Sequence, residues 1–118
     1  MESVYDLYQR GRELLEHGDH QAAIVSLSKA RDLEPDKDSI REALGRALFH
    51  AQHYECAAAE FRAVATKTPT NDYALFCLGR SLQLLGRHRE ARNPLALACS
   101  LRPERKDYRL YRDRARRA

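Results

Sequence analysis

A period of 34 residues runs through this chain, and it constrains the fold more than any other feature. Glycine, alanine, a large apolar residue and proline recur in the same order at this spacing. The three sets are Gly11, Ala23, Leu27, Pro35, then Gly45, Ala57, Phe61, Pro69, and then Gly79, Ala91, Leu95, Pro103. Self-similarity at a fixed period of roughly 20–50 residues is typical of stacked supersecondary units. We therefore expect an array of three similar units.

Each unit contains two apolar stripes at the spacing of an amphipathic helix, and no strand-like alternation of any length appears. Gly18 and Gly86 suit the turns between the stripes, whereas the middle unit has no glycine at its turn. Asp19 is placed to cap the helix that follows it, as is either Asn71 or Asp72. The repeated prolines end each unit because proline lacks a backbone N–H. The pattern predicts antiparallel helix pairs.

The remaining glycines lie in the middle of predicted helices, where glycine costs about 1 kcal/mol relative to alanine. A cost repeated at one phase of the repeat needs a reason, and close approach of the second helix of each pair supplies one. We expect Gly11, Gly45 and Gly79 to face the second helices, with alanines opposite. Those alanines are Ala23, Ala57 and Ala91.

The repeated pattern resembles the tetratricopeptide repeat, whose signature is W-x2-L-G-x2-Y, then A-x3-F, then P, with a period of about 34 residues. The matching residues are Leu7, Arg10, Gly11, Leu14, Ala23, Leu27 and Pro35 in the first copy, Arg41, Leu44, Gly45, Leu48, Ala57, Phe61 and Pro69 in the second, and Leu75, Leu78, Gly79, Leu82, Ala91, Leu95 and Pro103 in the third. Arg10 and Arg41 depart from the pattern, because apolar residues are usual at their positions.

The resemblance implies an all-α fold, an α-solenoid of three antiparallel helix pairs followed by a seventh helix. It covers nearly the whole chain, so we expect a single domain over residues 1–118. The repeats then span approximately residues 4–37, 38–71 and 72–105, and a capping helix spans 104–117.

Pro94 falls inside the predicted second helix of the third repeat. It removes the backbone hydrogen bond to Glu90 and crowds the preceding turn. We expect it to bend this helix between these two residues or to delay the start of the helix.

The net charge of +4 is unevenly placed. Residues 102–118 hold eight basic and three acidic side chains, whereas residues 1–101 are close to neutral. A solvated capping helix explains this Arg-rich segment, and docking to nucleic acid or to a membrane is the alternative. No apolar run approaches the roughly 18 residues that span a bilayer, and the N-terminus has no signal-like apolar core, so a cytoplasmic location is expected.

The sequence contains no motif that indicates an active site, so we do not expect an enzyme, a cofactor or a metal. His17 with His20, and His50 with His53, have a spacing that brings two imidazoles together, but no further ligand completes either pair. We interpret them as exposed turn histidines. The three cysteines fit neither a disulfide framework nor a zinc motif, and we expect them to line the core, with a reactive thiol as the alternative.

Because no active-site motif is present, a binding surface is the functional feature that the sequence can indicate. By the resemblance, the first helices of the pairs line a concave groove, and one groove position is arginine in every repeat and in the capping helix. The predicted binding residues are Tyr5, Tyr8, Arg12, Glu42, Arg46, Phe49, His50, Tyr73, Phe76, Arg80 and Arg114. Core packing does not explain a repeated arginine. Ion pairs with acids on adjacent helices, such as Glu42 or Glu16, are the simpler explanation, and a ligand is the other.

Arginine forks bind carboxylates or phosphates, and aromatic rings provide apolar anchors. We therefore predict a non-catalytic adaptor or scaffold that binds a peptide or helix, acidic and with apolar anchors. The family's clamp for chaperone C-termini is unsupported, because its Lys, Asn, Asn, Lys and Arg positions hold Tyr8, Arg12, Ala43, Tyr73 and Cys77. The alternatives are self-association, as a homodimer, through a terminal helix or the groove, and weak nucleic-acid binding through the basic C-terminal helix. Neither a membrane nor nucleic acid is the expected partner.

Overall fold

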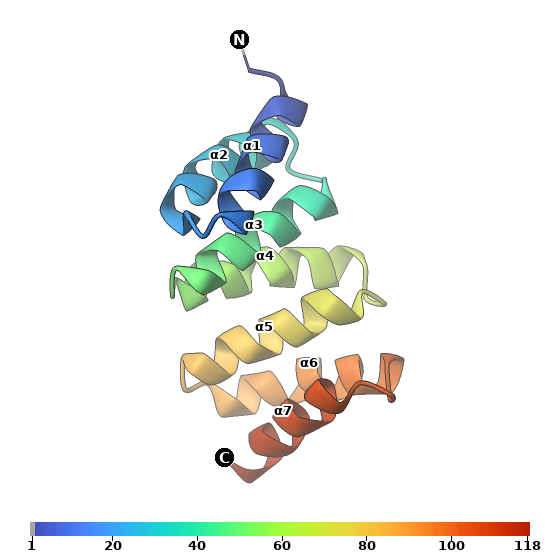
Figure 1. The fold of residues 1–118 in the computed structure, drawn as a ribbon. Helices are drawn as coiled ribbons and strands as arrows, with labels where there is room; N and C mark the ends of the chain where they lie inside the picture. Colours follow the sequence, from blue (N-terminus) through green and yellow to red (C-terminus); the bar gives the residue numbers. More distant parts are fainter. Residues whose placement is uncertain (1) are drawn as a thin grey trace.

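A computed structural model describes residues 2–118, and these residues form seven α-helices (Figure 1). The helices are α1 (Val4–Glu16), α2 (His20–Leu33), α3 (Asp38–His50), α4 (Tyr54–Lys67), α5 (Asp72–Leu84), α6 (His88–Leu101) and α7 (Lys106–Arg117). The start of every odd-numbered helix lies 34 residues after the start of the previous one, and the even-numbered helices follow the same rule. The predicted all-α solenoid of three helix pairs with a seventh helix is therefore confirmed.

Local signals explain most of the helix bounds. The side chain of Asp19 accepts a hydrogen bond from the Ala22 amide, and Asn71 accepts one from Ala74, so both predicted caps are present. Ser3 caps α1 in a reciprocal arrangement with Asp6. Each second helix ends two residues before the proline that closes its repeat. The seventh helix begins at Lys106, slightly later than its predicted start at 104.

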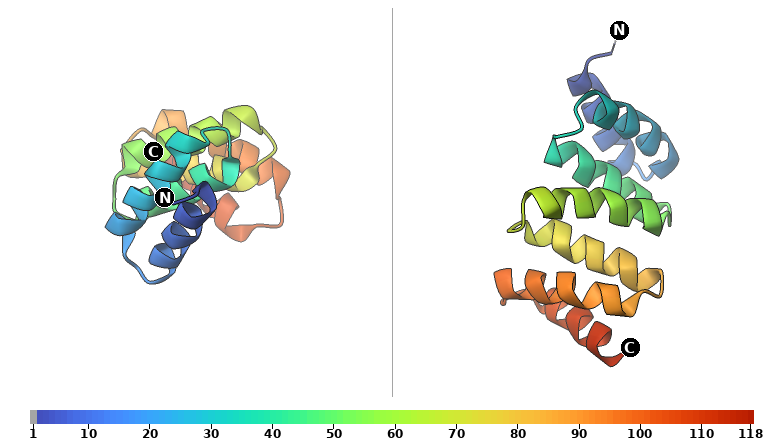
Figure 2. Two further views of the ribbon diagram at one scale, coloured as in Figure 1. Left: turned by 90° about the horizontal axis from the view of Figure 1, so that it is seen from above. Right: turned by 180° about the vertical axis from the view of Figure 1, so that it is seen from behind.

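The helices stack into a rod with extents of 49 × 24 × 22 Å. First helices α1, α3, α5 and α7 form one layer, and second helices α2, α4 and α6 form the other (Figures 1 and 2). Each helix packs on the next, and α1 also contacts α3 as α5 contacts α7. The core between the layers consists of side chains from all three pairs. Its largest fully buried members include Leu27, Leu44, Phe61, Leu82, Leu95 and Tyr108.

The mid-helix glycines leave room for side chains of the second helix in each pair. A Cβ atom at Gly11 would lie 2.4 Å from Leu27 Cγ, and one at Gly79 would lie 2.4 Å from Leu95 Cγ. At Gly45 the nearest atoms belong to the ring of Phe61, at 2.8 Å. The nearest side chains at these glycines are thus the large apolar residues of the signature, and the placing of the alanines opposite stays a prediction.

Pro94 does not delay its helix. α6 begins at His88, in register with α2 and α4, and continues past Pro94 to Leu101. The bend near Pro94 stays a prediction.

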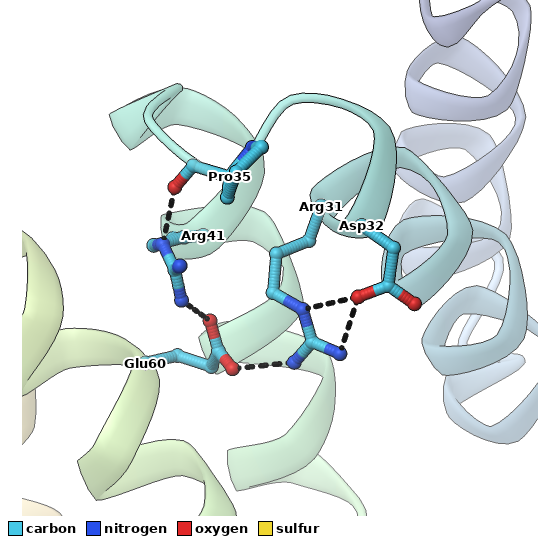
Figure 3. A network of polar contacts seen from close by, with 5 residues as sticks. All are labelled: Arg31, Asp32, Pro35, Arg41 and Glu60. Atoms are coloured by element: carbon cyan, nitrogen blue, oxygen red, sulfur yellow. Dashed lines mark hydrogen bonds and ion pairs between the residues drawn. The ribbon is translucent and has the colours of Figure 1, made fainter.

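A buried ion-pair network explains Arg41, one of the two departures from the family pattern (Figure 3). Glu60 of α4 is buried, and its two carboxylate oxygens accept hydrogen bonds from Arg31 at 2.7 Å and from Arg41 at 2.9 Å. Arg41 also donates to the backbone carbonyl of Pro35 at 2.7 Å, and Arg31 also bonds Asp32. The network ties α2, the loop after it, α3 and α4 together.

The other departure, Arg10, lies on the exposed side of α1, where no earlier helix pair covers it, and forms an ion pair with Glu2. Among residues 2–118, no helix is long and apolar enough to cross a membrane.

Candidate functional site

Two adjoining hollows lie on the first-helix side of the rod. The first, here called the polar hollow, has a volume of about 500 Å³. It lies between α1, α3 and the start of α5. Its lining residues are Tyr8, Arg12, Ser39, Glu42, Ala43, Arg46 and Tyr73. Both arginines are exposed, and their positions follow from the repeat, which turns the same helix face toward this side at every period.

The second hollow, here called the aromatic hollow, has a volume of about 450 Å³ and lies between α3, α5 and α7. Five aromatic rings surround it, together with two arginines. Its lining residues are Arg46, Phe49, His50, Phe61, Tyr73, Phe76, Cys77, Arg80, Asp107 and Tyr111. Arg46 and Tyr73 belong to both hollows, so the two form one continuous groove. We call this the first-helix groove.

The arginines that recur at one groove position do not form ion pairs within the described residues. Within residues 2–118, no carboxylate forms an ion pair with Arg12, Arg46, Arg80 or Arg114. Glu42, an expected partner, instead accepts a hydrogen bond from Asn71 at 2.6 Å. The explanation by pairing with neighbouring acids is therefore wrong for the part of the chain that the structure describes.

The structure brings most of the predicted residues together. All of them except Tyr5 and Arg114 line one or both hollows. Tyr5 is 69% exposed and borders a small depression at the start of α1, which shares Tyr8 and Ser39 with the polar hollow. The Arg114 guanidinium lies 5.0 Å from the centre of the Tyr111 ring and lines neither hollow.

Sequence reasoning missed part of the aromatic hollow. Tyr111 and Asp107 belong to α7, which the sequence indicates only as a cap, and Phe61 comes from α4 in the other layer. The apolar stripe of α7 was the available signal, since Tyr111 lies on its edge and is only half-buried.

Several contacts hold Tyr111 in place. Its carbonyl accepts a hydrogen bond from the Gln83 side chain at 2.9 Å. The Arg80 guanidinium lies 3.9 Å from the centre of its ring, within cation–π range, and the ring of Phe76 lies 5.7 Å away. The wall that α7 contributes is thus fixed before any ligand arrives.

Burial is the main cause of the pKa shifts of Cys77, Tyr73 and His50 in the aromatic hollow. It raises the pKa of the Cys77 thiol to about 12, so this thiol stays protonated at neutral pH and is a poor nucleophile. Burial also raises the pKa of Tyr73. The pKa of His50 is lowered by burial first, and then by the charges of His20 and Arg46. The arginine cations of the aromatic hollow therefore lie beside a neutral thiol, a neutral phenol and a neutral imidazole at pH 7.

The histidines pair across repeats and not along the chain. The rings of His20 and His50 stack with their centres 5.0 Å apart, and His53 contacts Gln21. Across residues 2–118, no three His, Cys, Asp or Glu side chains are grouped so that they could hold a metal. The cysteines differ from expectation in one case, because Cys56 is exposed, whereas Cys99 is buried.

Solved structures of similar fold are helical-repeat proteins. A structure described as MamA AMB-1 has a TM-score of 0.88 and 25% identity, covering 96% of this chain and 62% of its own. MamA from Desulfovibrio magneticus RS-1 has a TM-score of 0.91 and 24% identity, with 96% and 64% covered. The first TPR of Spaghetti (RPAP3), bound to the HSP90 peptide SRMEEVD, has a TM-score of 0.89 and 16% identity, with 97% and 90% covered.

Sequence comparison gives a consistent result. Superkiller complex protein 3 of Mus musculus is 30% identical over 83 residues, which are 70% of this chain but 5% of the mouse protein. The chain thus spans only a small part of this relative. The family described as Tetratricopeptide repeat matches residues 8–72, more than half of the chain. The repeat period, the glycine contacts and this match agree, and the chain belongs to the tetratricopeptide repeat family.

Proposed function

We propose that this chain is a non-catalytic adaptor that binds an acidic segment with apolar anchors in its first-helix groove. Tetratricopeptide repeats are protein-interaction modules, so protein binding is the family's general role. One observation carries the specific proposal. The guanidinium groups of Arg12, Arg46 and Arg80 have no carboxylate partner within residues 2–118, and they border hollows that are also lined by aromatic rings.

The chemistry of the groove suits such a ligand. An arginine without a carboxylate partner offers a planar fork of N–H donors, which binds a carboxylate through two parallel charge-assisted hydrogen bonds. Aromatic side chains form anchor sites with little loss of conformational freedom, because they have few rotatable bonds. A segment that combines acids with large apolar side chains would use both features.

The similar structure with a bound HSP90 peptide supports peptide binding on this fold, although its 16% identity says nothing about ligand identity here. The clamp positions of chaperone-binding domains hold only one basic residue in this chain, Arg12. We therefore do not propose a chaperone C-terminus as the ligand.

Selection of phage-displayed random peptides against the immobilised protein tests the proposal. We expect enriched peptides to combine acidic and large apolar residues, and to lose binding to the double variant Arg46→Ala/Arg80→Ala. The variant Arg62→Ala/Arg89→Ala removes the same charge from exposed positions on second helices and is the matched control. Melting curves of all three proteins confirm that any loss is not unfolding.

Enrichment of peptides that bind both double variants equally would place the binding site outside the groove and contradict the proposal. A parallel pull-down from cell lysate, with and without nuclease, examines the basic C-terminal helix. If nuclease released everything that the wild type captured, α7 and not the groove would be the main binding surface.

A further inference from the structure

The two hollows of the groove differ in chemistry although they share a wall. The polar hollow near α1 presents Arg12, the hydroxyl of Ser39 and the exposed side of Arg46. The aromatic hollow near α7 is lined by rings such as Phe76 and Tyr111. Each hollow is lined by two arginines, but Arg80 of the aromatic hollow already donates to Gln83 and stacks on Tyr111. A ligand that lies along the groove therefore meets the more available guanidinium groups at one end and the larger set of rings at the other.

The acids that border the groove are already engaged. Glu42 accepts a hydrogen bond from Asn71, and Asp107 is held by Arg105 through two hydrogen bonds, the shorter at 2.7 Å. Arg105 also keeps the pKa of Asp107 below its usual value. Neither carboxylate forms an ion pair with Arg12 or Arg46. Glu42 keeps its charge, but it is one carboxylate against two arginines in the polar hollow, so an anionic group is still favoured there.

The apolar end depends on the last helix. Tyr111 is fixed by Gln83 and by the stacking of Arg80, and α7 itself is anchored by the hydrogen bond from the Tyr108 hydroxyl to Asp72, at 2.7 Å. A preformed hollow costs less free energy of ordering when a side chain enters it. α7 is thus part of the binding surface as well as the end of the array.

We propose that the groove selects a segment in a fixed spatial order, with acidic residues against Arg12 and Arg46 and a neighbouring large apolar side chain against Tyr111. The inference rests on the proposed function, and it adds which end of the groove receives which part of the ligand. It also assigns Tyr111 of α7 as a specificity-determining residue. Because Arg46 borders both hollows, the acidic and apolar parts must be close neighbours in the ligand.

A matrix of peptides and variants tests this order. The probe is acetyl-Glu-Asp-Glu-Ser-Ser-Leu-Phe-amide, used also with its residues in reverse order, because either backbone direction can satisfy the two ends. One derivative replaces the acids by their amides, and another replaces Leu-Phe by Ser-Ser. Affinities are measured by fluorescence anisotropy for the wild type, Arg12→Gln and Tyr111→Ser, with Tyr111→Leu as a variant that keeps most of the apolar wall.

We expect Arg12→Gln to weaken the probe about tenfold and to leave the amide derivative unchanged, since only the carboxylates use this arginine. Tyr111→Ser should weaken the probe about tenfold and leave the Ser-Ser derivative unchanged, whereas Tyr111→Leu should retain most of the affinity. Arg62→Gln and Leu110→Ser are matched controls outside both hollows, and neither should matter.

A nitroxide label shows independently which end of the probe lies at which end of the groove. Placed at the acidic end of the bound probe, it should broaden NMR signals around Ser39, and placed at the apolar end, those around Tyr111. The opposite pattern, or variant effects that do not depend on the matching peptide feature, would overturn the order while leaving groove binding intact. If neither direction of the probe bound the wild type at millimolar concentration, both the order and the proposed function would be wrong.

Discussion

At the scale of single residues, Glu60 shows how a repeat position can change its chemistry without changing the fold. The same position holds Ser26 in the first repeat and Pro94 in the third. Glu60 is buried because Arg31 and Arg41 both donate to its carboxylate, which satisfies a charge that would otherwise be costly to remove from water. Arg41 is therefore compatible with a position that is usually apolar.

The substitution Arg41→Leu should lower the free energy of unfolding by about 1–2 kcal/mol, because it leaves the buried Glu60 with one partner. The double variant Arg41→Leu/Glu60→Leu should recover to within about 1 kcal/mol of the wild type, since apolar side chains of similar size replace the pair. Urea denaturation measures both. A double variant less stable than Arg41→Leu would mean that Glu60 contributes through contacts other than Arg41.

Gln52 has the left-handed backbone conformation that glycine has at the corresponding turns. Its φ is 66°, compared with 79° at Gly18 and 78° at Gly86. The substitution Gln52→Gly should raise the free energy of unfolding by about 0.5–1 kcal/mol, because a side chain with a Cβ is strained there. Gly86→Ala is the reciprocal control and should lower it. A lower melting temperature for Gln52→Gly would show that the Gln52 side chain makes stabilising contacts.

Binding of an acidic peptide should strengthen a few-fold as the pH falls from about 7.5 to about 6. The pKa of His50 is lowered by burial, by the charge of His20 and by the charge of Arg46. A carboxylate bound beside Arg46 would offset the effect of the arginine charge on His50. Binding then raises the pKa of His50 and takes up a proton, so affinity increases as the pH falls. Asp107, the carboxylate that borders the hollow, stays charged in this range because Arg105 holds its pKa below the usual value.

Peptide titrations at several pH values, by calorimetry, check this expectation. The variant His50→Gln should give an affinity that no longer varies over the same range. A flat profile for the wild type would mean that the bound carboxylate does not approach His50.

At the scale of helices, the bounds could be predicted because the signals that set them are local. Gly18, Asp19 and Pro35 act within a turn of their own positions, and the 34-residue period checks each assignment three times. The polar network around Glu60 could not be predicted in the same way, because it joins side chains from three helices. Tyr111 was missed for a related reason. The apolar stripe of α7 indicates that this helix packs on the array, but not which of its side chains reach the groove.

The seventh helix differs from the earlier first helices on the face that they turn toward their second helix. The positions that face the second helix are Leu75, Leu78, Gly79 and Leu82 in α5, and Arg109, Arg112, Asp113 and Arg116 in α7. Charged residues on this face leave no apolar surface for a second helix, and at the glycine position Asp113 adds a side chain where the earlier pairs need space. On this face α7 therefore lacks the apolar surface and the space that α5 offers to its second helix.

Pro94 offers a test at the level of one helix. Pro94→Ala restores the hydrogen bond to the Glu90 carbonyl within α6, and we expect it to raise the free energy of unfolding by about 1–2 kcal/mol. The gain is smaller than the full cost of proline in a helix because the unfolded chain also becomes more flexible. Denaturant unfolding measures the change. A loss of stability would show that the Pro94 ring, which lines a small hollow with Leu75 and Leu97, contributes more by packing.

At the scale of the whole molecule, the groove could be predicted from sequence to the extent that it follows the repeat. Residues at equivalent positions, such as Arg12, Arg46 and Arg80, necessarily lie on one side of the rod. The division into a polar and an aromatic hollow could not be predicted, because it depends on α7 closing one end and on which acids are engaged elsewhere.

The outer face of α1 determines whether such rods stack end to end. In α3 the residues that pack on the preceding pair are Ile40, Ala43, Leu44 and Ala47, all buried, and the corresponding residues of α1 are Asp6, Gln9, Arg10 and Glu13. Burying these polar groups against another copy would cost free energy without returning apolar contact. We therefore expect a monomer in sedimentation velocity at concentrations up to about 100 µM, well above the Kd of a typical stable dimer.

A gain-of-function variant makes this expectation specific to the α1 face. The variant replaces four residues of α1 by those of α3: Asp6→Ile, Gln9→Ala, Arg10→Leu and Glu13→Ala. Its α1 then has the apolar face of α3, but no other helix pair within residues 2–118 covers that face. This variant should self-associate, because an exposed apolar face of this kind is stabilised by burial against a second copy. If the wild type already formed dimers and the variant did not strengthen them, association would involve the groove or α7, and acidic peptide should then compete with it.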